Sequence, residues 1–135
     1  MLYLSNLNMK QDIQNRADIE LLVRSFYDKV IVDDEIGYIF TDVVKVQWEK
    51  HLPVMYDFWE NTLLFTGIYK GNPMLIHEHL HKRINLTEQH FARWNQLFIL
   101  TVDELFEGNK ATLAKQRALS ISTIMQIKII HGKQF

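Results

Sequence analysis

The chain has 135 residues, 47% of them hydrophobic, which fits one compact domain with a sizeable core. A net charge of −1 and the lack of a dense Lys/Arg run give no reason to expect nucleic acid or a membrane surface as a partner. The absence of cysteine excludes disulfides, thiolate-bound zinc, iron–sulfur clusters and cysteine nucleophiles.

We expect a flexible N-terminal arm over residues 1–16, followed by a single domain over residues 17–135. The arm does not have the basic segment, apolar stretch and small-residue cleavage site of a secretory signal. No apolar run approaches the roughly 20 residues that span a bilayer. The sequence therefore predicts a cytoplasmic protein.

Helical periodicity dominates the first half of the chain. Asp18 can cap a helix that runs to about residue 30, and Asp33 or Asp34 can start a single turn. A longer helical region is predicted over about residues 43–65, and Pro53 predicts an irregular turn near His51 and Leu52. The apolar stripes are Ile19, Leu22, Val23, Phe26 and Val30, then Ile36, Ile39 and Phe40, then Val44, Trp48, Met55, Phe58, Trp59 and Thr62.

The second half is also helical. The expected boundaries are a loop between Gly67 and Gly71, a short helix from Asn72-Pro73 to about Lys82, a helix from Thr87 to Gly108, and a last helix from Asn109 to about Gly132. No stretch alternates with a period of two, so no strand is predicted. The predicted fold is all-α, with helices too unequal in length for a regular four-helix bundle.

Residues 77–81, His-Glu-His-Leu-His, match the pattern H-E-x-x-H. In a zinc peptidase, His77 and His81 would hold the metal from one helix face, and Glu78 would act as general base. A second interpretation needs only His77, which can reach from a short helix into an apolar pocket as an axial ligand of haem iron.

The zinc interpretation finds little support elsewhere in the chain. It needs a third ligand, and His90 can converge on the motif only if two helices fold back tightly. Peptidases of this type also bind substrate along a sheet edge, and no strand is predicted. Eight Phe, five Tyr and three Trp would provide ample lining for a flat apolar ligand, although aromatic residues are also ordinary core material.

Three side chains with polar tips face inward from three predicted helices: Tyr27, His51 and Trp94. Each of them alone is readily explained as a core residue bonded to a backbone acceptor. Three together are less ordinary, because a buried donor without a partner costs about 1–3 kcal/mol. An oxygen-like ligand on a metal would give all three a partner.

Short segments over residues 17–130 share their order and spacing with a known family. They are Ser25-Phe26-Tyr27-Asp28-Lys29-Val30, Tyr38-Ile39-Phe40, Trp48-x-x-His51-x-Pro53 with Tyr56-Asp57-Phe58-Trp59, Gly71-Asn72-Pro73-Met74-x-x-His77-x-x-Leu80, His90-Phe91-x-Arg93-Trp94 and Thr101-Val102-Asp103-Glu104-Leu105-Phe106. In this pattern the chain resembles the truncated haemoglobins of the third group, which are bacterial two-over-two globins. The glycine pairs that mark the other two truncated groups are absent.

The resemblance implies a globin-like two-over-two helical sandwich that binds haem b. It implies His77 as the proximal iron ligand, Tyr27 and Trp94 as distal donors, and His51 as the distal gate. Among the histidines of residues 77–81, the spacing from the preceding proline favours His77. The other expected residues of the haem pocket are Phe40, Met55, Phe58, Leu80 and Phe91, and Arg83 and His81 are candidates for holding the propionates.

The resemblance also implies dioxygen, nitric oxide and carbon monoxide as ligands. A donor-lined pocket should release dioxygen slowly, which suits oxygen, nitric oxide or peroxide chemistry better than bulk delivery. One alternative is a haem enzyme, a nitric oxide dioxygenase or peroxidase, which would need an unidentified reductase. Another is a helical interaction domain without a cofactor, whose aromatic residues form only its core.

Overall fold

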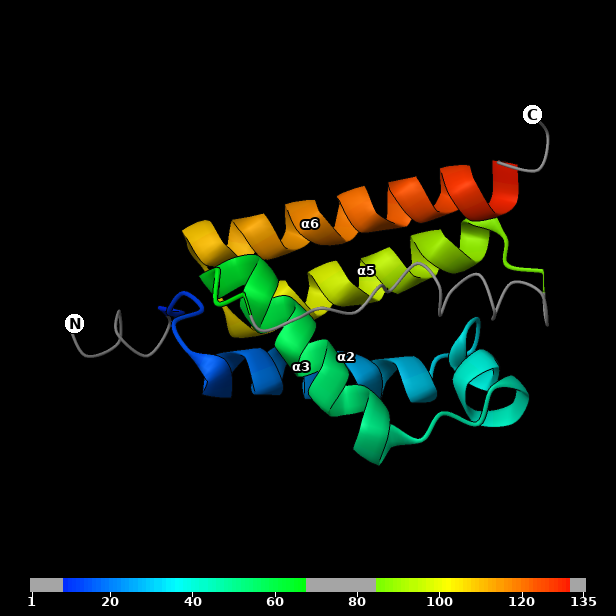
Figure 1. The fold of residues 1–135 in the computed structure, drawn as a ribbon, viewed down its shortest axis with the longest axis horizontal. Helices are drawn as coiled ribbons and strands as arrows, with labels where there is room; N and C mark the ends of the chain where they lie inside the picture. The colour runs from blue at the N-terminus through cyan, green and yellow to red at the C-terminus, as the bar shows by residue number, and fades with distance from the viewer. Residues whose placement is uncertain (1–8, 68–84, 132–135) are drawn as a thin grey trace.

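The computed structural model describes residues 9–67 and 85–131, and every regular element within these two ranges is a helix. The prediction of an all-α chain is therefore confirmed (Figure 1). In chain order the elements are the α-helix α2 (Arg16–Ile31), the π-helical segment η1 (Ile39–Val43), the α-helices α3 (Trp48–Leu64), α5 (Glu88–Leu105) and α6 (Asn109–Met125), and the π-helical segment η2 (Gln126–His131).

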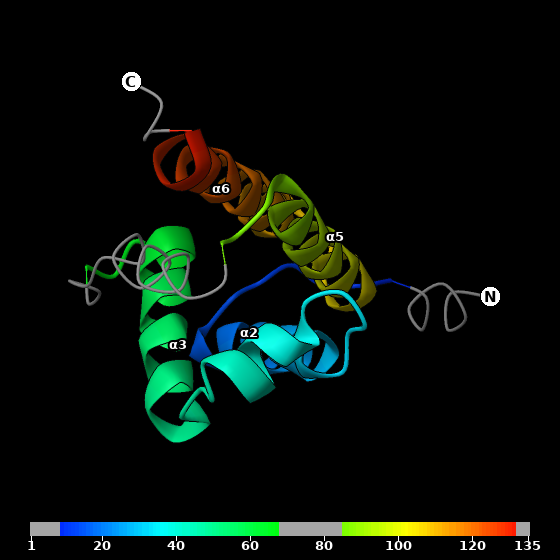
Figure 2. The ribbon, with the colours of Figure 1, turned by 90° about the vertical axis from the view of Figure 1, so that its right-hand side faces the viewer.

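These helices form two stacked pairs. Helices α5 and α6 lie side by side and run in opposite directions, and α3 crosses α2 in the other layer (Figures 1 and 2). Helix α2 packs against both α3 and α5, so it links the two layers. This is the two-over-two arrangement that the resemblance implies.

Helix α2 buries one apolar stripe, as its sequence predicts. It begins earlier than expected, because the side chain of Asn15 caps it by accepting a hydrogen bond from the backbone N–H of Asp18 at 3.0 Å. Asn15 has an extended backbone, as a capping residue requires. The buried residues of the stripe are Ile19, Leu22, Val23, Phe26 and Val30.

Between α2 and α3 the chain makes a tight turn. The Asp33 carboxylate accepts the backbone N–H groups of Glu35 and Ile36, so this turn starts as predicted. The expected helix start near residue 43 is wrong, because α3 begins only at Trp48. Lys45 has a φ of +54°, and a residue in the left-handed region interrupts an α-helix.

Pro53 does not interrupt α3, so the irregular turn expected there is wrong. Proline removes one hydrogen bond from a helix. Pro53 lies in the second turn of α3, close to the start of the helix. The first N–H groups of a helix have no partner within the helix in any case, so the lost hydrogen bond adds to a region that is already incompletely bonded. The unbroken helix keeps His51 and Met55 one turn apart on one face.

The segment before α2 is attached to the start of α6. The Asp12 carboxylate accepts the backbone N–H groups of Lys110 and Ala111 at 2.9 and 2.8 Å. Ile13 beside it is 2% exposed. Residues 10–13, which belong to the expected flexible arm, thus pack on the helical body: Asp12 caps the start of α6, and Ile13 joins the core.

Helix α6 has Gly108 as its N-cap, one residue before the predicted Asn109. Thr87 caps α5 as predicted. The expected short helix from Asn72 to about Lys82 lies outside the described residues. In the part of the chain that the structure describes, no helix is both long and apolar enough to cross a bilayer.

Candidate functional site

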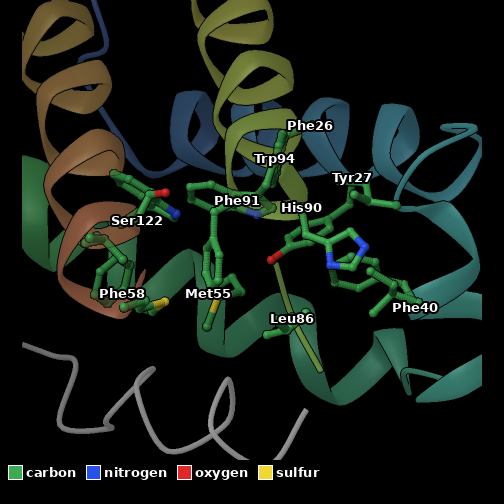
Figure 3. Close-up of a pocket in the computed structure, with 15 residues that line it drawn as sticks. Phe26, Tyr27, Phe40, Met55, Phe58, Leu86, His90, Phe91, Trp94 and Ser122 are labelled. Carbon is green, nitrogen blue, oxygen red and sulfur yellow. The ribbon is translucent and has the colours of Figure 1, made fainter. Parts of the chain in front are cut away.

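One pocket lies between the two helix pairs, and its walls come from α2, the turn around η1, α3, α5 and α6 (Figure 3). The walls are mostly apolar. The space inside them is about 790 Å³, counting the part open to solvent.

The structure brings most of the predicted site residues together in this pocket. His51 is not part of the wall but touches it through a hydrogen bond to Tyr27. His77 and Leu80 lie outside the described residues. The predicted residues that line the pocket are Tyr27, Phe40, Met55, Phe58, Phe91 and Trp94.

Tyr27 and His51 form a polar pair at one side of the pocket. The Tyr27 hydroxyl lies 3.2 Å from His51 Nε2, although the two residues come from different helices. Burial raises the pKa of Tyr27, so the hydroxyl keeps its proton at neutral pH. Phe40 and Trp48 contact the Tyr27 ring at centroid distances of 6.2 and 5.1 Å and hold it in place.

Trp94 reaches the same pocket from α5, and its ring is fixed by two phenylalanines. It meets Phe26 edge to face at 5.4 Å and stacks on Phe98 at 5.8 Å. Phe26 also contacts Tyr27 at 4.9 Å, so one buried ring sets the relative positions of Tyr27 and Trp94. No acceptor among the described residues bonds to the indole N–H of Trp94.

Sequence reasoning missed several pocket residues. Ile121 and Met125 are apolar and lie one turn apart in the last helix, a stripe that by itself indicates burial. Nothing local in the sequence says that this stripe faces the same cavity as Tyr27. The missed lining residues are Phe26, Ile36, Ile39, Trp59, Leu86, His90, Ile121, Ser122 and Met125.

His90 lines the pocket from the first turn of α5. It forms a capping box with Thr87: the backbone N–H of Thr87 donates to His90 Nδ1 at 3.1 Å, and the backbone N–H of His90 donates to Thr87 Oγ1 at 3.3 Å. The imidazole is half-buried and fixed by this box.

An ion pair joins the turn between α2 and η1 to helix α5. Arg93 donates from Nε and Nη2 to Asp33 Oδ1 at 2.9 and 2.6 Å, and the Asp33 side chain is 5% exposed. The hydrogen bonds from Arg93 lower the pKa of Asp33, with help from the backbone donors of the turn and against the effect of burial. The pair holds the turn that carries Phe40 against the helix that carries Trp94.

The described residues contain no group of three His, Cys, Asp or Glu side chains that could hold a metal ion. The H-E-x-x-H motif of residues 77–81 lies outside them. His90, the third ligand that a zinc site would need, already uses Nδ1 in the capping box.

The fold and pocket define a small helical globin. The model of the bacterial-like globin family matches residues 10–127, and the chain belongs to this family. The group 3 truncated hemoglobin of Campylobacter jejuni is 28% identical over 121 residues, which cover 87% of this chain and 93% of that protein. The crystal structure of a group III truncated hemoglobin from Campylobacter jejuni matches with a TM-score of 0.76 and 27% identity, covering 90% of this chain and 95% of that one.

These matches confirm the resemblance and the truncated-globin fold that the sequence predicts. Membership of the family implies a haem-binding globin.

Proposed function

We propose that this protein binds haem b in the pocket and takes up dioxygen, nitric oxide or carbon monoxide at the iron. The observation that carries the proposal is the position of Tyr27 and Trp94. Their hydrogen-bond donors come from α2 and α5 and meet in a pocket whose other walls are almost entirely apolar. Such a combination suits a small ligand with a polar end.

The pocket fits haem in its chemistry. A porphyrin is flat and apolar, and Phe40, Phe58 and Phe91 offer aromatic surface to it. Met55 adds a flexible side chain that adapts to irregular shapes. By resemblance, Leu80 belongs to the same lining.

By resemblance, His77 holds the iron from the proximal side. A neutral imidazole supplies one ring nitrogen to the metal, and its other N–H needs a backbone or carboxylate acceptor to fix the ring. The haem iron supplies the bond to the diatomic ligand.

Tyr27 and Trp94 then act on the ligand as hydrogen-bond donors. In such a site the outer atom of dioxygen is more polar than that of carbon monoxide, so hydrogen-bond donors stabilise bound dioxygen more than bound carbon monoxide. Bonds to a charged or strongly polar acceptor are about twice as strong as neutral ones, and the dry pocket strengthens them further. The result is slow release of dioxygen.

A haem titration of the purified protein tests the proposal. We expect a Soret band that saturates at one haem per chain and shifts when carbon monoxide is added to the reduced protein. The Tyr56→Phe variant is a matched control, because Tyr56 is a buried tyrosine of α3 that does not line the pocket. A helical protein that takes up no stoichiometric haem would contradict the proposal and favour a cofactor-free interaction domain.

A further inference from the structure

His90 is a polar group of the pocket that the proposed function leaves without a role. The other polar groups on the walls are Tyr27, Trp94 and Ser122. Tyr27 pairs with His51, and Ser122 Oγ accepts a hydrogen bond from Gln126 at 3.2 Å. His90 lies at the start of α5, one turn before Trp94, and its hydrogen bonds are with Thr87.

The capping box determines which nitrogen of His90 carries the proton. Nδ1 accepts the backbone N–H of Thr87, so its lone pair is in use and it carries no hydrogen. In a neutral imidazole the proton must then be on Nε2. His90 therefore presents an N–H donor to its surroundings, and in this state it has no free lone pair for a metal.

The position of His90 favours an anionic acceptor. It is the third residue of α5, within the first turn, where the helix dipole is positive. The ring is half-buried and lines the pocket, so its donor lies at the pocket wall. A carboxylate at the edge of a bound ligand would meet both the donor and the field.

We propose that His90 Nε2–H donates to a propionate carboxylate of the haem and thereby sets how the haem is seated in the pocket. This inference rests on the proposed function, because haem is the ligand whose carboxylates are involved. His90 is a positioning residue in this account, and Thr87 acts through it by fixing its tautomer.

Two variants separate this role from simple helix capping. His90→Gln keeps both functions, because glutamine at this position of a capping box accepts from the Thr87 backbone and still has an N–H₂ donor. His90→Ala removes both functions. Thr87→Ala is the structural control: it removes the hydroxyl half of the cap but keeps the backbone N–H that fixes His90.

The experiment measures the rate of haem loss to an excess of a haem-scavenging apoprotein. It is run with haem b and with its dimethyl ester, which has no carboxylates. With haem b, His90→Ala should lose haem about tenfold faster than the parent, as expected for one hydrogen bond to a charged group. His90→Gln and Thr87→Ala should stay close to the parent rate. With the dimethyl ester, all four proteins should lose the porphyrin at similar rates.

The inference is overturned if His90→Ala loses haem b no faster than Thr87→Ala does. It is equally overturned if the increase in His90→Ala persists with the dimethyl ester, since the effect would then be one of helix capping. A parent protein that never takes up haem would instead contradict the proposed function itself.

Discussion

The Tyr27 hydroxyl already has a partner in the absence of any ligand. His51 Nε2 lies 3.2 Å away, so in the tautomer in which this nitrogen accepts, a ligand that takes the hydroxyl hydrogen competes with the imidazole. Under the proposed function, this competition would give His51 a role in ligand entry, whereas the indole N–H of Trp94 has no acceptor among the described residues. A ligand that bonds to Tyr27 would therefore cost a hydrogen bond to His51, whereas a ligand that bonds to Trp94 would cost no hydrogen bond to a described residue.

His51→Ala should speed the entry of carbon monoxide into the reduced haem protein. The Tyr27 hydroxyl no longer has to leave its partner, and the removed side chain leaves space. One neutral hydrogen bond is worth about 0.5–1.5 kcal/mol, so we expect a rate about twofold to tenfold higher. Flash photolysis measures the rate. Lys50→Ala, an exposed change next in the chain, is the control, and equal rates in the two variants would remove His51 from the entry path.

His77→Gly should leave a folded helical protein that retains haem poorly, because it removes the only strong bond to the iron expected from the proximal side. Added imidazole should restore a five-coordinate ferrous spectrum. The same substitution at His79 and at His81 serves as the comparison. Loss of that spectrum in either of these variants, with His77→Gly unaffected, would assign the ligand to a different residue.

At the level of elements, the start of α6 depends on a residue about a hundred positions away. Burial alone would raise the pKa of Asp12, but the backbone N–H groups of Lys110, Ala111 and Ile13 together lower it. Gly108 permits this contact: a Cβ at that position would lie 2.5 Å from Asp12 Cγ, and its φ is +144°. The segment before α2 and the α5–α6 turn therefore form one structural unit.

Asp12→Ala should lower the free energy of unfolding at pH 7 by about 1 kcal/mol, the usual cost of losing a helix cap. Because the pKa of Asp12 is lowered in the folded protein, its stabilisation is fully present above the unfolded-state pKa of about 3.9 and is lost as the pH falls through the folded-state pKa. Urea unfolding at several pH values should show the parent and the variant converging below about pH 4.

The exposed Asp34→Ala variant is the control for this series and should show no such convergence. A constant difference between the parent and Asp12→Ala at all pH values would mean that the charge of Asp12 does not contribute.

Gly108→Ala should destabilise the same unit by roughly 1–3 kcal/mol, the range for a residue held in a backbone region that only glycine adopts easily. The added Cβ must also displace the Asp12 side chain. Thermal unfolding measures the loss, and Gly67→Ala is the comparison, because nothing lies near a Cβ at that glycine although its φ is also positive. Equal losses in both variants would show that the contact with Asp12 adds nothing.

Elements set by local patterns could be predicted from the sequence, and elements set by distant contacts could not. The stripe of α2 and the Thr87 cap of α5 depend on residues within one or two turns, and both are confirmed. The cap at Asp12 joins segments that lie far apart in the chain, so no local pattern reveals it. Lys45 adopts a left-handed backbone with no glycine to mark it, so the sequence pattern predicts too early a start for α3.

At the scale of the whole molecule, the pocket exists because two helix pairs each contribute one wall. Tyr27 belongs to the α2–α3 pair and Trp94 to the α5–α6 pair, with Phe26 in contact with both rings. The sequence could predict that Tyr27, His51 and Trp94 face inward. It could not predict that Ser122 and Met125 close the same cavity, because their place depends on how the two pairs stack.

Release of dioxygen from the reduced haem protein, measured by stopped flow in Tyr27→Phe, Trp94→Phe and the double variant, tests the central claim most directly. Each single change removes a donor and keeps the aromatic bulk, so release should be about tenfold to a hundredfold faster. The increase in release rate in the double variant should be smaller than the product of the two single-variant increases, because both donors bond to one ligand and rearrange together. Carbon monoxide release should change much less. Dioxygen rates equal to that of the parent in both single variants would show that Tyr27 and Trp94 are only core packing, and would contradict the account.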